Sequence, residues 1–136
     1  MQETIDDVQA EWLPIMLQGS PSEICVFNCE TLRFEYANQA AIDNLQYSLD
    51  ELRGMSPASI VQGISPEAYE ELLADLRNGS VASISVNTVH VRRDGTAYPI
   101  ESRLFFLAAS TGPVIIAIGN DVSSRDESDK ALRASE

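Results

Sequence analysis

Hydrophobic and polar residues alternate with a period close to two along the C-terminal part of the chain. The alternation indicates three long β-strands, at Val81–Arg92, Ala97–Leu107 and Val114–Val122. Two turn signals separate them, Arg93-Asp94-Gly95-Thr96 and Ser110-Thr111-Gly112. Because both connections are short, we expect these strands to form an antiparallel meander.

Two shorter strands are expected before this meander. Glu23–Asn28, with the sequence EICVFN, is rich in residues that favour strands. In Leu32–Ala37 apolar and polar side chains alternate, and a polar turn lies between the two segments. We therefore expect an N-terminal hairpin.

Short helices are expected between the two groups of strands. Asn38 is a suitable N-cap for a first helix, and Ser48 with Glu51 forms an S-x-x-E capping box for a second. A longer helix is expected over residues 65–79, which begin with Ser-Pro-Glu and end with glycine. Helices of one or two turns are not stable alone, because nucleation costs more than so few residues return. Their apolar sides must therefore share a core with the strands.

Both ends of the chain carry helical patterns of their own. Residues 1–22 contain an amphipathic helix, which Pro14 either interrupts or restarts as a first-turn proline. Residues 123–136 contain a further capping box and predict the start of a helix that leaves the domain. The order of elements predicts an α+β fold, whose core over residues 23–122 is a five-stranded antiparallel sheet with helices on one face.

The composition narrows the range of partners. The chain has 136 residues, 44% of them hydrophobic, which fits a single core, and a net charge of −12, which repels phosphate backbones and anionic lipids. We therefore expect no nucleic-acid partner. All nine basic residues are arginine except Lys130, which suits either a halophilic host or a high-GC genome. The longest apolar run, Val114–Ile118, is too short to cross a membrane, and no signal peptide is seen, so we expect a cytoplasmic protein.

Few residues carry recognisable chemistry. Cys25, Cys29 and the single histidine, His90, do not have the spacing of a zinc site, and Cys25 lies in an apolar run where cysteine acts as a small hydrophobe. No catalytic triad, Walker loop, G-x-G-x-x-G or H-E-x-x-H pattern is present. We expect neither a metal site nor an enzyme.

In combination, four segments resemble the PAS domain, the sensory module of histidine kinases, diguanylate cyclases and transducers. They are the N-terminal hairpin, YANQAA followed by NLQYSLDELRG, the turn RRDGTAYPIE, and GNDVSSRDE at the end of the last strand. The resemblance covers residues 23–126. One departure is Gln46, where the family commonly has glycine before Tyr-Ser; it affects a turn and not the fold.

The resemblance implies an apolar cavity between the sheet and the short helices. Light-sensing flavin members carry a reactive cysteine near the position of Pro57, so we expect no covalent flavin, while non-covalent flavin stays open. Haem members carry an axial histidine on the long helix, which has none here, and we expect His90 to be an ordinary strand residue. The expected occupant is a small organic ligand or nothing.

Candidate lining residues follow from the inward phases of strands and helices. Plain core packing is the competing interpretation for most of them. Ser102 stands out because it places a small hydroxyl where a large aliphatic residue would close the core, and we expect Ser102 and Met55 to border the ligand space. The full set is Val26, Ile42, Leu45, Leu52, Met55, Ile60, Leu72, Leu76, Val86, Ile100, Ser102, Leu104 and Ile116.

The termini are expected to transmit the signal. Asp121 closes the last strand and can accept hydrogen bonds from backbone or arginine, which would couple the sheet to the exit helix. The N-terminal helix either covers the outer face of the sheet, together with Phe105, or pairs with its copy in a homodimer; its apolar residues are Ile5, Val8, Trp12, Ile15 and Met16. Two functions are consistent with the sequence. One is a sensory domain that signals to an output domain, either in a cytoplasmic protein or in the cytosolic part of a membrane-bound receptor, and the other is a ligand-free dimerisation module.

Overall fold

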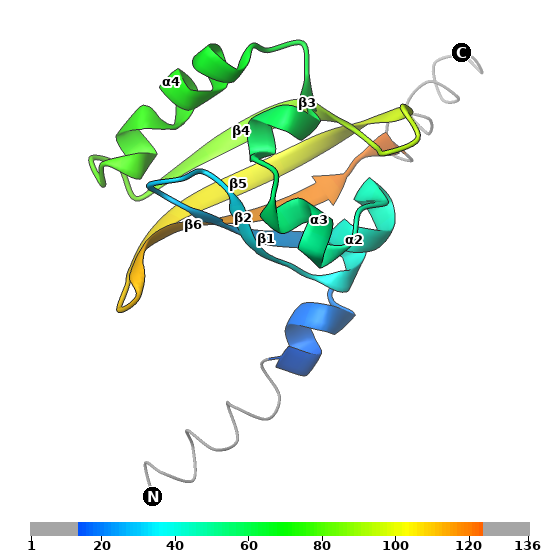
Figure 1. Ribbon diagram of the computed structural model, residues 1–136, viewed down its shortest axis with the longest axis horizontal. Coiled ribbons are helices and arrows are strands. Elements are labelled where there is room, and N and C mark those ends of the chain that lie inside the picture. The colour runs from blue at the N-terminus through cyan, green and yellow to red at the C-terminus, as the bar shows by residue number, and fades with distance from the viewer. Residues whose placement is uncertain (1–13, 124–136) are drawn as a thin grey trace, which may run out of the picture.

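A single antiparallel sheet forms the back of the molecule, and the helices that follow β2 lie across one of its faces (Figure 1). The computed structural model describes residues 14–123. Within them the elements run β1 (Glu23–Asn28), β2 (Phe34–Ala37), α2 (Gln39–Leu45), α3 (Leu49–Arg53), the 3₁₀ helix η1 (Pro57–Ile60), β3 (Val61–Gln62), α4 (Pro66–Arg77), β4 (Ser83–Val91), β5 (Ala97–Ala109) and β6 (Gly112–Asp121). Residues 14–19 are helical as well, while the part of the predicted N-terminal helix that precedes Pro14 lies outside the described residues.

The sheet of the described residues has six strands in the order β2-β1-β6-β5-β4-β3, with every neighbouring pair antiparallel. The predicted α+β fold is thus confirmed, but the predicted strand number was one too low. The additional strand is β3, whose two residues pair with Val89 and His90 of β4. A two-residue strand carries no alternation that a sequence pattern could reveal.

Capping residues define the short helices as the sequence predicts. The Asn38 side chain accepts a hydrogen bond from the Ala41 amide, and Ser48 with Glu51 forms a complete capping box. Ser65 caps α4 in the same way, through the Ala68 amide. The capping box predicted after residue 123 lies outside the described residues.

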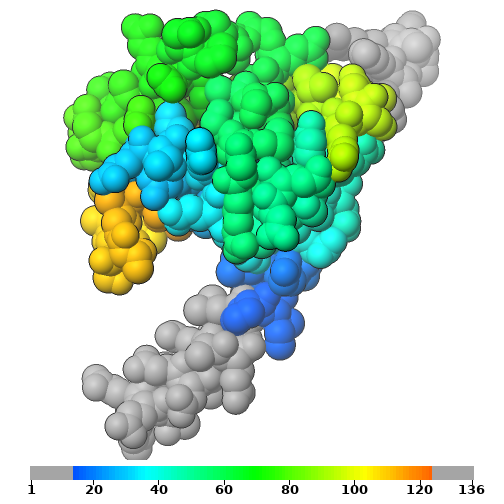
Figure 2. All heavy atoms as spheres, in the orientation of Figure 1, coloured from blue at the N-terminus to red at the C-terminus, as the bar shows by residue number. Residues whose placement is uncertain are grey.

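The helices bury their apolar sides against the inner face of the sheet. In the space-filling view their atoms hide most of the strands behind them (Figure 2). The two phenylalanines at the β1–β2 hairpin, Phe27 and Phe34, pack edge to face with ring centroids 4.8 Å apart. The largest fully buried apolar side chains come from both layers: Phe34, Leu45, Leu52, Leu73, Leu76, Tyr98 and Ile115.

Asn38 is fully buried and fastens three segments to one another. Its Oδ1 accepts from the backbone amides of Ile24 (2.9 Å) and Ala41 (3.2 Å). Its Nδ2 donates to the carbonyls of Leu17 (2.8 Å) and Ser22 (2.9 Å). One amide side chain therefore joins the N-terminal helical residues, β1 and the start of α2.

No helix within residues 14–123 has both the length and the apolar content needed to span a bilayer.

Candidate functional site

A small cavity of about 30 Å³ lies between the sheet and the helical layer. That volume has room for about two water molecules. The wall is largely apolar with a few polar groups, and its residues are Glu23, Cys25, Phe27, Phe34, Leu45, Pro57, Ile60, His90, Ile100, Ser102, Ala117 and Gly119.

Four of the predicted lining residues do border the cavity: Leu45, Ile60, Ile100 and Ser102. Most of the others belong to the surrounding core. Leu52, Leu76 and Leu104 are buried in it, and Ile42, Met55 and Val86 are partly buried against it. Ser102 lines the cavity as expected, whereas Met55 is not among the lining residues and packs against the core instead.

Val26 and Ile116 were assigned to the wrong face of the sheet. They pair with each other across β1 and β6, whereas the residues on either side of Val26 in β1, Cys25 and Phe27, are the buried ones. The four central positions of EICVFN are all apolar, so alternation alone does not fix which face points inward, and a shift of one residue reverses every side chain.

Leu72 was also expected at the cavity, but its side chain remains 43% exposed. It lines a wide open groove of about 650 Å³ with Ile64, Val86 and the edge of β4. The buried face of α4 is made by Tyr69, Leu73 and Leu76. Because Leu72 and Leu73 are adjacent, the helical period places only one of them at the centre of that face.

Sequence reasoning missed the polar end of the cavity. Glu23 begins an apolar strand and shares the inward phase of Cys25 and Phe27, yet a glutamate at a strand end is usually exposed. Gly119 interrupts the apolar run of β6, and a glycine inside a strand often marks close approach of a ligand or another chain. Gly119 was therefore the one feature of the sequence that could have indicated the polar end of the cavity.

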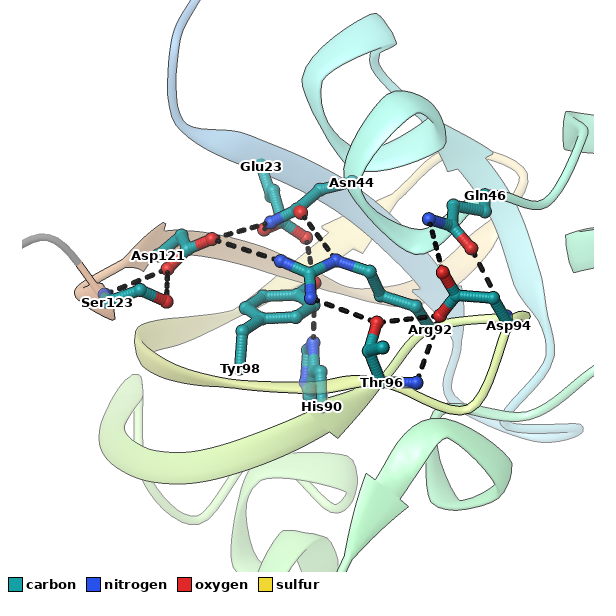
Figure 3. Close-up of polar contacts among 10 residues, drawn as sticks. All are labelled: Glu23, Asn44, Gln46, His90, Arg92, Asp94, Thr96, Tyr98, Asp121 and Ser123. Atoms are coloured by element: carbon teal, nitrogen blue, oxygen red, sulfur yellow. Dashed lines mark hydrogen bonds and ion pairs between the residues drawn. The ribbon is translucent and has the colours of Figure 1, made fainter.

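Glu23 is the centre of a buried hydrogen-bond network (Figure 3). Its side chain is 6% exposed; Oε1 accepts from the Tyr98 hydroxyl and Oε2 from Asn44 Nδ2, each at 2.9 Å. The Tyr98 oxygen also lies 3.4 Å from His90 Nδ1. Burial raises the pKa of the Glu23 carboxyl above its ordinary value, although the hydrogen bonds from Asn44 and Tyr98 oppose the shift.

The same network reaches the end of the last strand. Asn44 Nδ2 also donates to Asp121 Oδ2 at 3.1 Å, and the Arg92 guanidinium pairs with that oxygen at 3.7 Å while lying over the Tyr98 ring. Asp121 Oδ1 accepts from the Ser123 backbone amide at 2.9 Å. Asp121 therefore does accept hydrogen bonds from backbone and an arginine contact, as the sequence predicted, and it connects the cavity wall to the last described residue (Figure 3).

Two other titratable side chains face the cavity in their neutral forms. Burial lowers the pKa of His90 to about 4, so the imidazole is uncharged at neutral pH. Burial raises the pKa of the Cys25 thiol to about 12, so it is not a reactive thiolate. His90 was expected to be an ordinary strand residue, and its position at the cavity was not foreseen.

Comparison with known families gives one match that covers most of the chain: a family model described as the PAS domain matches residues 21–124. No curated protein sequence matches.

Several solved structures share the fold. The PAS domain of an HTR-like protein from Haloarcula marismortui is 20% identical, with a TM-score of 0.74, and the match covers 88% of this chain and 97% of that one. A PAS domain from Desulfitobacterium hafniense is 27% identical, with a TM-score of 0.68 and coverage of 79% and 98%. A domain of a sensory box sensor histidine kinase/response regulator from Geobacter sulfurreducens is 17% identical, with a TM-score of 0.71 and coverage of 83% and 94%.

Proposed function

The chain belongs to the PAS domain family, and from that premise we propose that it is the cytoplasmic sensory domain of a signal-transduction protein, with a small organic ligand as its input. The observation that carries this proposal is the cavity of about 30 Å³, which has both an apolar wall and a polar end. Ligand sites typically combine an apolar lining with a few placed polar groups.

The volume restricts the ligand class. Flavin and haem are many times larger than two water molecules, and they would require the helical layer to move away from the sheet. Pro57, which stands near the position of the reactive cysteine of flavin members, is itself part of the cavity wall. A ligand of a few non-hydrogen atoms fits this wall with the smallest rearrangement.

The route of the signal follows the network around Glu23. A ligand that displaces the Glu23 carboxylate also disturbs Asn44, which is bonded to both Glu23 and Asp121. Asp121 in turn holds the Ser123 amide at the beginning of the exit segment. Such a ligand transmits a signal only if it binds one arrangement of this network more tightly than the other. The receiving element is an output domain of the same signalling protein.

Native mass spectrometry of freshly purified protein tests the receptor function. We expect a retained extra mass that is lost on denaturation, and an absorption spectrum without flavin or haem bands. The variant Ser102→Leu fills the cavity and serves as the comparison, because it should lose the extra mass while remaining folded. Protein that is always empty, and that no small-molecule library stabilises, would contradict the proposal.

A second function, a ligand-free dimerisation and relay module, is favoured by the outer face of the sheet. Ile118 and Leu107 on that face are 37% and 47% exposed, and Ile15 and Met16 of the N-terminal helical residues are 72% and 58% exposed. Phe105 lies in the same strand phase as Leu107 and is partly buried. The remaining residues of the expected dimer helix, Ile5, Val8 and Trp12, lie outside the described residues.

Sedimentation velocity separates the two functions. If the outer face pairs with a second copy, Ile118→Glu shifts the protein from dimer to monomer. Leu72→Glu is the matched control, because Leu72 has similar exposure but belongs to the helical layer. A dimer that survives Ile118→Glu, or that Leu72→Glu dissociates equally, argues against this surface.

A further inference from the structure

Gly119 forms the floor of the cavity between two polar side chains. In the sheet it lies directly opposite Glu23 of β1 on one side and Ser102 of β5 on the other. A Cβ atom at position 119 would lie 2.6 Å from Ile100 Cδ1 and 2.9 Å from Ser102 Oγ. Ile100 and Ser102 therefore occupy the space directly above the glycine, and the absence of a side chain at position 119 lets them lie close to β6 beside the cavity.

The groups around this space are hydrogen-bond acceptors. The Tyr98 hydroxyl gives its single proton to Glu23, so its contact with His90 Nδ1 requires the imidazole to donate. His90 Nε2 is then an acceptor in the neutral ring. Each oxygen of Glu23 takes one hydrogen bond from the protein, and a carboxylate oxygen has a second lone pair. The hydroxyl of Ser102, which also lines the cavity, can accept a hydrogen bond as well.

Among the described residues Glu23 forms no ion pair, and Arg92 acts on its charge only from a greater distance. No arginine or lysine is among the residues that line the cavity. Arg92 forms its ion pair with Asp121, at 3.7 Å, and reaches Glu23 only through Asn44, whose Oδ1 accepts from Arg92 Nε at 3.1 Å. A buried carboxylate without an adjacent cation favours a ligand that brings one.

We propose that the cavity is selective for a small protonated primary amine, whose ammonium group binds at the polar end of the cavity, between Glu23 and Ser102. The inference rests on the proposed receptor function and adds the chemistry of its ligand. An ammonium group has three N–H donors, and the cavity wall offers it acceptors from Glu23, Ser102 and His90. The short apolar part of the amine faces Leu45 and Ile60. Anionic ligands are repelled by Glu23.

Methylammonium is a suitable probe, because its two non-hydrogen atoms fit a cavity with room for about two waters. Methanol is the neutral counterpart of nearly the same size. Both are titrated into ¹⁵N-labelled protein at pH 7.5 in phosphate buffer, which contains no amine, at constant ionic strength set with sodium chloride. The readout is the saturable shift of the Gly119 amide resonance.

We expect methylammonium to bind at least about tenfold more tightly than methanol, a difference of about 1.4 kcal/mol. Glu23→Gln keeps the size of the side chain and removes its charge, so this preference should disappear. Glu30→Gln, at an exposed glutamate away from the cavity, should leave it unchanged. Equal binding of the two probes, or full methylammonium affinity in Glu23→Gln, would overturn the proposal.

Two further variants guard against misfolding. In Gly119→Ala the added methyl group collides with Ile100 and Ser102, so that they must shift, which should abolish binding of both probes; its own spectrum shows whether it folds. If it does not fold, Ser102→Ala removes one acceptor without a steric clash and should weaken methylammonium binding about threefold or more, with little effect on methanol. Unchanged methylammonium affinity in Ser102→Ala counts against the ammonium position.

The outcomes also distinguish this inference from the receptor function on which it rests. Binding of methanol or another neutral molecule at Gly119 without any preference for methylammonium leaves a receptor whose ligand is not an amine. Absence of binding by every probe, together with consistently empty purified protein, removes the receptor function as well.

Discussion

Gln46 and Asp94 are joined by two hydrogen bonds, although 48 residues separate them in the sequence. Gln46 Nε2 donates to Asp94 Oδ2 at 3.2 Å, and the Asp94 amide donates to Gln46 Oε1 at 3.1 Å (Figure 3). Gln46 ends α2 in the left-handed region, at φ 68°, a conformation that favours glycine. The glutamine thus combines the turn with a link between α2 and the β4–β5 hairpin.

This arrangement predicts different effects for two substitutions of Gln46. Gln46→Ala loses both hydrogen bonds and keeps the unfavourable backbone conformation, whereas Gln46→Gly loses the bonds but removes the backbone cost of about 1 kcal/mol. We therefore expect Gln46→Ala to be less stable than Gln46→Gly by about that amount in urea unfolding. Equal stabilities of the two variants would show that the backbone at residue 46 is not left-handed in solution.

The raised pKa of Glu23 predicts that the free energy of unfolding increases when this carboxyl is protonated. Because burial raises its pKa in the folded state, the folded protein holds this proton more tightly than the unfolded chain does. The contribution is fully present below the ordinary pKa of 4.5 and is lost as the pH rises through the folded-state pKa. The wild type should therefore gain stability relative to Glu23→Gln as the pH is lowered from 7 to about 4.5. A constant difference between the two urea-unfolding curves across this range would contradict the shift.

The lowered pKa of His90 predicts the opposite effect of pH on folding stability, over a pH range that overlaps that of Glu23. Its folded-state pKa of about 4 lies below the ordinary value of 6.5, so the neutral folded form is favoured above pH 6.5 and that advantage is lost as the pH falls toward 4. We expect the wild type to lose up to roughly 3 kcal/mol relative to His90→Gln between these pH values. Direct titration of the imidazole resonances by NMR is the independent check, and a pKa near 6.5 would refute the prediction.

Asn38 predicts a strong effect from an isosteric change. Asn38→Asp keeps the acceptor for Ile24 and Ala41 but turns a carboxylate oxygen toward the carbonyls of Leu17 and Ser22. Loss of two donors at a fully buried site should cost about 3 kcal/mol or more and speed amide exchange in residues 14–22. Asn120→Asp is the control: Asn120 is exposed, and its Oδ1 keeps the bond from Ser22, so we expect a change within about 0.5 kcal/mol. Similar costs at both positions would mean that Asn38 is not the fastening point described.

Much of the fold was predictable because local signals and tertiary structure agree. The bounds of β1 match the predicted strand, Ser48 and Glu51 form the capping box expected of them, and Ser65 caps α4. In each case residues close in sequence determine the geometry, through alternation or a hydrogen bond to a nearby amide.

The site was less predictable because its residues are fixed by distant partners. Glu23 is buried only because Tyr98 and Asn44, far along the chain, supply its hydrogen bonds. The run VIIAI of β6 is apolar at every position, so the sequence does not show that Ala117 faces the cavity and Ile116 the other side. Pairing register, which depends on the whole sheet, decides the question.

Because Gly119 has no side chain, even a substitution by the small residue alanine would affect the cavity. One nucleotide change can convert glycine to alanine, and the added methyl group would collide with Ile100 and Ser102, which line the cavity. A single mutational event could thus change the shape of the cavity between the sheet and the helical layer. Among PAS domains, we expect glycine at this position of the last strand to accompany an internal cavity, and a larger residue to accompany a filled core.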